Sequence, residues 1–155
     1  MNYNCICCLQ HATDGGVRCM AILLEKEMNT DVTRIHPDKT VKFAGQILKA
    51  VNIGCMVVVD DAGKILGILT ERDIVQKVVA DGYDPKTTPV KEIMSKDVIT
   101  MDKKRTVEEA IDLMEKNKIK KIPIVDRGKL VGIVTMTDLM KTLRKAESTG
   151  KAKNG

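Results

Sequence analysis

The sequence predicts an α+β fold made of two β-α-β-β-α repeats that pack sheet to sheet about a pseudo-twofold axis. The first observation is a phrase written twice, GILTERD at residues 67–73 and GIVTMTD at residues 132–138. The second is that these phrases close two longer segments, residues 28–74 and 94–139, which align with one deletion in a turn. One unit of about 50 residues buries too little surface to fold alone, so we expect the two copies to share one body.

The first copy contains a short strand, a helix, two strands and a second helix in that order. Apolar residues recur at helical spacing from Val41 to Val51. The runs CMVVVD and ILGILT are rich in β-branched residues, and the turn DAGK between them predicts a hairpin. A second amphipathic helix is expected near Arg72–Ala80.

The second copy repeats this order. Thr106 and Glu109 form a capping-box signature at the start of a helix that extends through Met114. The runs KIPIVD and LVGIVT flank the turn RGK and predict a second hairpin. The last helix is expected near Thr137–Arg144.

The repeat also divides the chain into parts. These are an extension that is disordered or non-native (1–19), the first repeat (20–82), a linker (83–93), the second repeat (94–145) and a flexible basic tail (146–155). Met20 is a candidate native start, because the residues before it share no pattern with those after it. In the linker, Thr88 and Pro89 are placed to cap and open a short helix toward Met94.

The composition is that of a soluble globular protein, with 43% hydrophobic and 30% charged residues. One Phe, two Tyr and no Trp disfavour base-stacking platforms for nucleic acid. We interpret the net charge of +5 as solvated surface, rather than as contact with nucleic acid or an acidic membrane. No apolar run approaches the ~18 residues of a membrane span and no secretory signal is visible, so we expect a cytoplasmic protein.

Four of the five cysteines crowd the N-terminus. An odd number with this clustering is typical of reduced thiols rather than of a disulfide framework. A metal site with Cys5, Cys7, Cys8, His11 and Cys19 as ligands is the alternative. Its spacing differs from that of zinc ligand pairs, and adjacent cysteines cannot easily both face one ion, so we expect no metal.

The repeat resembles a tandem pair of cystathionine-β-synthase (CBS) domains, known as a Bateman module. The matching features are DVxxxxxxxTV, the pair MVVVD and IPIVD, and an apolar Gly-x-x-Thr-x-x-Asp phrase in both copies. The resemblance implies a sensor of energy or metabolite state that binds AMP, ADP, ATP or S-adenosylmethionine in clefts between the repeats and requires no cofactor. It also implies a homodimer, with four CBS units in a flat disc.

The residues alone allow two roles for the repeated Thr-x-x-Asp. Thr70 and Thr135 each close a strand and open a helix, whose free backbone N–H groups suit a phosphate. Asp73 and Asp138 follow three residues later, where a carboxylate suits the paired hydroxyls of a ribose. Alternatively, the threonines are N-caps and the aspartates complete capping boxes. The two roles can coexist.

The resemblance implies further ligand contacts in each copy. At the start of the first strand it indicates Arg34 and Thr100. Before the central strand it indicates the pairs Met56-Val57 and Ile122-Pro123 as the walls of an adenine pocket. Pro123 also lacks a ladder N–H, which marks an edge or an opening where a ligand can approach.

The two expected sites are unequal in charge. The family position that faces phosphate is basic in the second copy, with Lys121 preceded by Lys120, whereas the first copy has Cys55 preceded by Gly54. Arg72 can supply compensating charge in the first copy. The alternative for these three cations is solvated surface. We therefore expect the second site to be the better equipped for phosphate.

Together these features predict a regulatory module that binds an adenosyl ligand and signals to an unnamed partner protein. The alternative is a ligand-free module that dimerises or docks on a partner. We expect no catalysis, because the sequence lacks a phosphate loop, a nucleophile elbow and an H-E-x-x-H motif. His36 precedes Pro37 in an expected turn, and the two aspartates of the repeated phrase occupy equivalent places in separate clefts.

Overall fold

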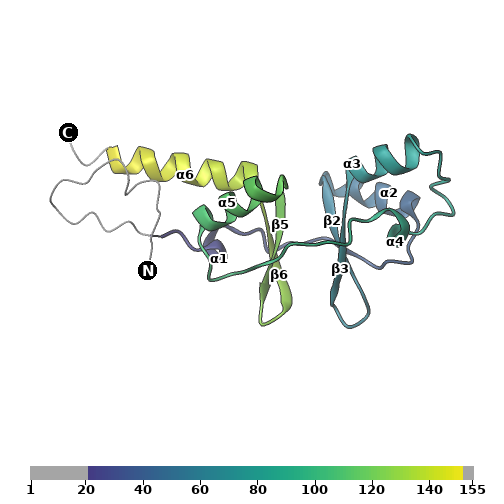
Figure 1. Ribbon diagram of the computed structural model, residues 1–155, viewed down its shortest axis with the longest axis horizontal. Coiled ribbons are helices and arrows are strands. Elements are labelled where there is room, and N and C mark those ends of the chain that lie inside the picture. Colours follow the sequence, from purple (N-terminus) through teal and green to yellow (C-terminus); the bar gives the residue numbers. More distant parts are fainter. Residues whose placement is uncertain (1–20, 152–155) are drawn as a thin grey trace.

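The computed structural model describes residues 21–151, which form two three-stranded sheets with helices on their outer sides. In Figure 1 the sheets stand side by side at the centre, with α2 and α3 beyond one sheet and α5 and α6 beyond the other. The predicted α+β fold of two repeats packed sheet to sheet is confirmed. The N-terminal cysteines and His11 lie outside the described residues.

The first repeat forms one sheet in the order β1-β2-β3, with β1 parallel to β2 and β3 antiparallel to β2. Its elements are β1 (Arg34–Ile35), α2 (Val41–Val51), β2 (Cys55–Val59), β3 (Ile65–Thr70), α3 (Glu71–Asp73) and η2 (Ile74–Val79). The helix expected near residues 72–80 is present, but its second part has wider turns. There the Ala80 N–H donates to the Val75 carbonyl, five residues back, at 3.1 Å.

The second repeat has the same topology, in the order β4-β5-β6. Its elements are β4 (Met101–Asp102), α5 (Val107–Asn117), β5 (Lys121–Asp126), β6 (Lys129–Thr135) and α6 (Met136–Lys151). Helix α6 extends past the expected end at Arg144 into the segment predicted to be flexible, where Lys, Ala and Glu favour helix. No helix among residues 21–151 is both long and apolar enough to cross a bilayer.

Helix ends and turns follow from local chemistry. Thr106 and Glu109 form the predicted capping box of α5, and Thr40 caps α2 by accepting from the Phe43 N–H at 3.3 Å. In the hairpin turns Gly63 and Gly128 have φ of 79° and 78°, a conformation that side chains disfavour.

Strand alternation separates two kinds of side chain in the central strands. Met56 and Val58 of β2 lie in the core of the first repeat, and Ile122 and Ile124 of β5 lie in the core of the second. Because successive side chains of a strand point to opposite faces, the residues between them face away from the helices, toward the other repeat.

Each of two short helices packs into the core of the repeat that it does not precede. Helix α1 (Leu24–Glu27) precedes the first repeat, yet Leu24 is fully buried in the core of the second. Helix α4 (Val90–Ile93) precedes the second repeat, yet both its end residues lie in the core of the first. The predicted range of the first repeat, residues 20–82, includes α1. Each repeat therefore completes its core with a helix from outside its own β-α-β-β-α unit.

The linkers after these helices cross the opposite sheet. Asn29 bridges to Ile133 of β6, and Ser95 bridges to Ile68 of β3. The predicted cap of α4 is partly wrong. Its N-cap is Pro89, which has no side-chain cap bond, while Thr88 is buried and its carbonyl accepts from the Val41 N–H at 3.0 Å.

The glycines of the repeated phrase lie beneath these crossings. A Cβ on Gly67 would lie 2.5 Å from Met94 Sδ, and a Cβ on Gly132 would lie 2.6 Å from Met28 Sδ. Each linker therefore packs directly on a strand backbone. Glycine recurs in both phrases because it alone leaves room for this approach.

Candidate functional site

A cavity of about 150 Å³ lies where the two repeats meet. Its walls come from the linker before β1, the start of β2, and the strands β5 and β6. Three predicted site residues line it: Val57, Lys121 and Thr135. The cavity therefore takes side chains from both copies of the repeat.

Lys121 is the cation of this cavity. It begins β5 and reaches across to the first repeat, where its Nζ lies 3.1 Å from the place of a Cβ on Gly54. The absence of a side chain at Gly54 makes room for the ammonium group. The lysine also acts on the Cys55 thiol, which lines the same cavity. Burial raises the pKa of that thiol above its ordinary value of 9.0, against the opposing effect of the lysine.

Thr135 lines the cavity and is hydrogen-bonded to Asp138, which does not line it. The Thr135 hydroxyl donates to Asp138 Oδ2 at 2.6 Å and accepts from the Asp138 N–H at 3.3 Å. The side chain of Asp138 is 56% exposed, and its Oδ1 makes a long ion pair with Lys141 Nζ at 3.9 Å, beyond hydrogen-bond distance. An exposed carboxylate at a helix start can accept hydrogen bonds from a diol.

The corresponding carboxylate of the first repeat is enclosed. Asp73 and Thr70 form a complete capping box, in which Oδ2 accepts from the Thr70 N–H at 2.9 Å and from its hydroxyl at 2.6 Å. Oδ1 accepts from Lys77 Nζ at 3.0 Å and from Ser95 Oγ at 3.3 Å. Burial acts to raise the pKa of Asp73, but the bonds from Thr70 and Lys77 outweigh it and hold that pKa below 3.8. The capping alternative thus describes the geometry of this copy.

Ten of the thirteen predicted site residues do not line the cavity, among them Met56, Ile122, Arg34 and Thr100. Met56 and Ile122 are buried against the helices, because strand alternation turns only one residue of each expected pair toward the other repeat. Arg34 donates from its guanidinium to the Leu130 carbonyl at 3.2 Å, which ties β1 to the second repeat. Thr100 lines a separate depression. None of these four side chains lines the cavity, and their contact with a ligand stays a prediction.

Arg72 and Lys120 are exposed, as in the solvated-surface alternative. Pro123 lies in the central strand β5 rather than at an edge, so of the two predicted alternatives the opening remains. Its missing N–H still has a consequence. At the equivalent place in the first repeat, the Val57 N–H donates to the Thr33 carbonyl at 3.1 Å. Proline cannot make the corresponding bond, so the Ile99 carbonyl lacks this donor.

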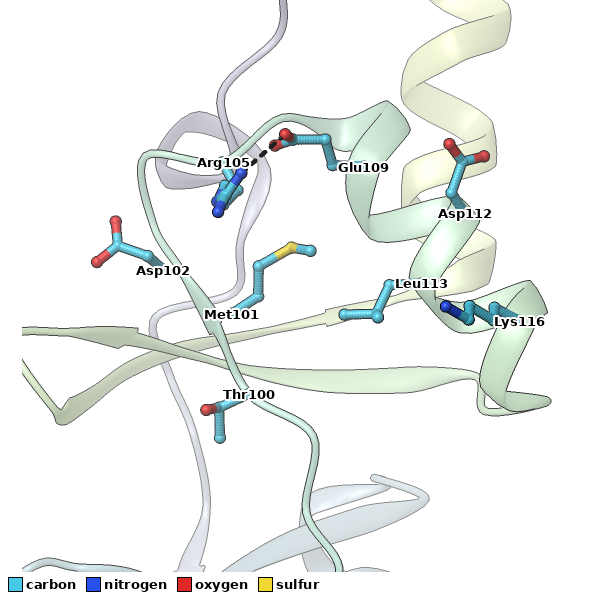
Figure 2. A pocket seen from close by; sticks show the side chains of 8 residues that line it. All are labelled: Thr100, Met101, Asp102, Arg105, Glu109, Asp112, Leu113 and Lys116. Atoms are coloured by element: carbon cyan, nitrogen blue, oxygen red, sulfur yellow. Dashed lines mark hydrogen bonds and ion pairs between the residues drawn. The ribbon is translucent and has the colours of Figure 1, made fainter. Parts of the chain in front are cut away.

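The depression that includes Thr100 has a volume of about 580 Å³ and is open to solvent, on the outer side of the second repeat. Figure 2 shows its wall along α5, where Arg105 Nη1 pairs with Glu109 Oε1 at 3.0 Å and Asp112 and Lys116 follow. Charges of both signs alternate around it, which is typical of a solvated helix face.

Sequence reasoning missed the linker side of the cavity, which contributes Asn29, Asp31, Val32 and Thr33. A signal was available, because Asp31-Val32 recurs as Asp97-Val98 in the repeat alignment. Within residues 21–151, no cluster of three or more His, Cys, Asp or Glu side chains is arranged to hold a metal ion.

The family follows from a comparison with known proteins. A family model described as CBS domain matches the chain twice, over residues 22–80 and 90–145. The chain belongs to the CBS domain family. Each match contains one β-α-β-β-α unit, so the protein is a CBS domain pair.

Relatives of this CBS pair include short and long proteins. It is 38% identical over 125 residues to the CBS domain-containing protein YhcV of Bacillus subtilis, covering 81% of this chain and 88% of that protein. It is also 37% identical to the inosine-5′-monophosphate dehydrogenase of Methanocaldococcus jannaschii, where the match covers 81% of this chain but 24% of the dehydrogenase.

This CBS pair resembles a solved structure over nearly the whole length of that structure. The CBS domain pair of protein MJ0100, in complex with 5′-methylthioadenosine and S-adenosyl-L-methionine, matches with a TM-score of 0.74 and 28% identity. The match covers 81% of this chain and 98% of that one.

Proposed function

We propose that this CBS pair is a regulatory module that binds an adenosyl ligand (AMP, ADP, ATP or S-adenosylmethionine) at the cavity between its repeats. The open carboxylate of Asp138 carries this proposal. It would accept hydrogen bonds from the ribose hydroxyls, while Lys121 inside the cavity would neutralise a phosphate or carboxylate of the ligand. The adenosyl ligands of the MJ0100 domain pair support the ligand class.

The size of the cavity supports a coupling between binding and shape. Ligand pockets commonly measure about 300–1,000 Å³, whereas this cavity measures about 150 Å³. A nucleoside therefore fits only if the cavity widens. We infer that the linker 29–33 is the wall that would move, because it joins α1 in the second core to β1 in the first sheet. Binding would shift the equilibrium between the narrow and the wide arrangement of the repeats. The free energy of that shift cannot exceed the difference between the ligand's binding free energies for the two arrangements.

We also propose that this CBS pair forms a homodimer and signals to a partner protein. Large apolar side chains remain exposed on the outer helices, among them Val75 and Val79 one helical turn apart, with 58% and 72% exposed. A second copy that covered them would remove this surface from water, as expected for a disc of four CBS units.

The free Cys55 thiol is consistent with the expected cytoplasmic location. We propose no catalytic role.

The test is calorimetric titration of the ligand-stripped protein with AMP, ADP, ATP and S-adenosylmethionine at fixed salt. We expect Asp138→Asn to weaken binding of the ligand at least about tenfold, the usual loss for a hydrogen bond to a charged group. Lys141→Gln is the matched control, since its ammonium group lies 3.9 Å from the same carboxylate yet is exposed. A folded protein that binds none of the four ligands would refute the proposal and favour a ligand-free interaction module.

A further inference from the structure

The two repeats hold their corresponding aspartates in different ways. Each oxygen of Asp73 accepts two hydrogen bonds, Oδ2 from Thr70 and Oδ1 from Lys77 and Ser95. Its side chain is only 13% exposed. Since a carboxylate offers about four lone-pair sites, this one has none left for a ligand.

Lys77 is anchored at a second point as well. Its Nζ also donates to the carbonyl of Ile93, the last residue of α4, at 2.7 Å. The ammonium group therefore bridges η2 and α4. Ser95, which completes the shell of Asp73, lies two residues beyond Ile93 in the linker that crosses β3.

The second repeat has no lysine at this position. In the repeat alignment Thr142 corresponds to Lys77, and Glu27 corresponds to Ile93. The Thr142 hydroxyl donates to Glu27 Oε2 at 2.6 Å, so this pair joins α6 to α1 without involving Asp138. A different pair of residues thus joins these two helices, and Asp138 keeps only a long ion pair with the exposed Lys141, whose Nζ lies 3.9 Å from Oδ1.

We propose that Lys77 closes the first of the two corresponding ligand sites, so that each chain binds one adenosyl ligand, through Asp138. This inference rests on the proposed function. A ribose at Asp73 would have to displace both the lysine and the serine hydroxyl, and the Ile93 carbonyl would lose its donor. Polar groups that lose their partners without replacement oppose such an exchange.

The experiment exchanges the two bridging pairs and counts bound ligand by calorimetry. Lys77→Thr gives the first repeat the residue of the second, and we expect the stoichiometry to rise from one to two ligands per chain. Adding Asp73→Asn to that variant should return it to one. The reverse exchange, Glu27→Ile with Thr142→Lys, places a lysine four residues after Asp138 and should weaken binding at least about tenfold.

Lys49→Thr is the control for loss of one positive charge, because Lys49 is exposed on α2. Asp73→Asn in the otherwise unchanged protein provides a readout that needs no second site, and we expect its ligand affinity to stay within about twofold of the parent protein. Thermal unfolding of each variant establishes that it is folded.

The outcomes separate the two proposals. Two ligands per parent chain, one ligand per Lys77→Thr chain, or a large loss of affinity in Asp73→Asn would overturn the role of Lys77 while the proposed function stands. No binding by the parent protein or by any variant would remove the proposed function, and the inference with it.

Discussion

Replacing Gly67 by alanine tests the close approach of a linker to a strand. The new Cβ would lie 2.5 Å from Met94 Sδ, 2.9 Å from Met94 Cγ and 3.0 Å from the Ser95 carbonyl oxygen. The methionine can turn aside, but the carbonyl is backbone. It accepts from the Ile68 N–H at 3.0 Å, and the Ser95 N–H donates to the Ile68 carbonyl at 2.9 Å. The linker must therefore move off the sheet.

Overpacking of this kind costs about 1–3 kcal/mol, and the restricted unfolded chain offsets about 0.5–1 kcal/mol of it. We expect Gly67→Ala to lower the free energy of unfolding by about 0.5–2 kcal/mol, measured by urea unfolding. The matched control is Gly45→Ala, within helix α2, where a Cβ would meet nothing within 4 Å. There alanine should stabilise the protein by up to about 1 kcal/mol. Equal stabilisation by both substitutions would refute the packing argument.

Two further predictions follow from the titrating groups. A carboxyl whose pKa is lowered on folding contributes stability above its ordinary pKa, 3.8 for Asp73, and loses it as the pH falls through the folded value. The unfolding free energy should therefore drop more between about pH 6 and about pH 2.5 in the parent protein than in Asp73→Asn; parallel curves would contradict this. The raised pKa of Cys55 predicts slow alkylation by iodoacetamide at neutral pH. A ligand in the cavity should slow it further, as followed by mass spectrometry of the Cys55 peptide, and an unchanged rate at saturation would place the ligand elsewhere.

The Thr-x-x-Asp phrase has a structural explanation in both copies. Thr70 and Thr135 each accept from the N–H of the aspartate three residues on, so each caps a helix. Recurrence of the phrase therefore does not by itself require a ligand. What distinguishes the copies is the surroundings of the carboxylate, which Lys77 and Ser95 fill in the first repeat.

Much of the fold was accessible from local patterns. Helical spacing, β-branched runs and turn residues predicted the main helices and both hairpins, because hydrophobic periodicity and capping act over a few residues. The repeat itself predicted that two units share one body, since neither buries enough surface alone. The inequality of charge around Lys121 was also visible, as the two copies differ at that position in an otherwise matched alignment.

Other features depended on contacts between residues far apart in the sequence. No local pattern places Leu24 in the core of the second repeat or sets Met94 on Gly67. The face that each residue of Met56-Val57 presents depends on strand register against the neighbouring strand, which spacing alone leaves open. The enclosure of Asp73 needs Lys77 from one helix and Ser95 from a linker to meet at one carboxylate. Periodicity specifies elements, whereas the folded chain brings together the groups that enclose one aspartate and leave the other exposed.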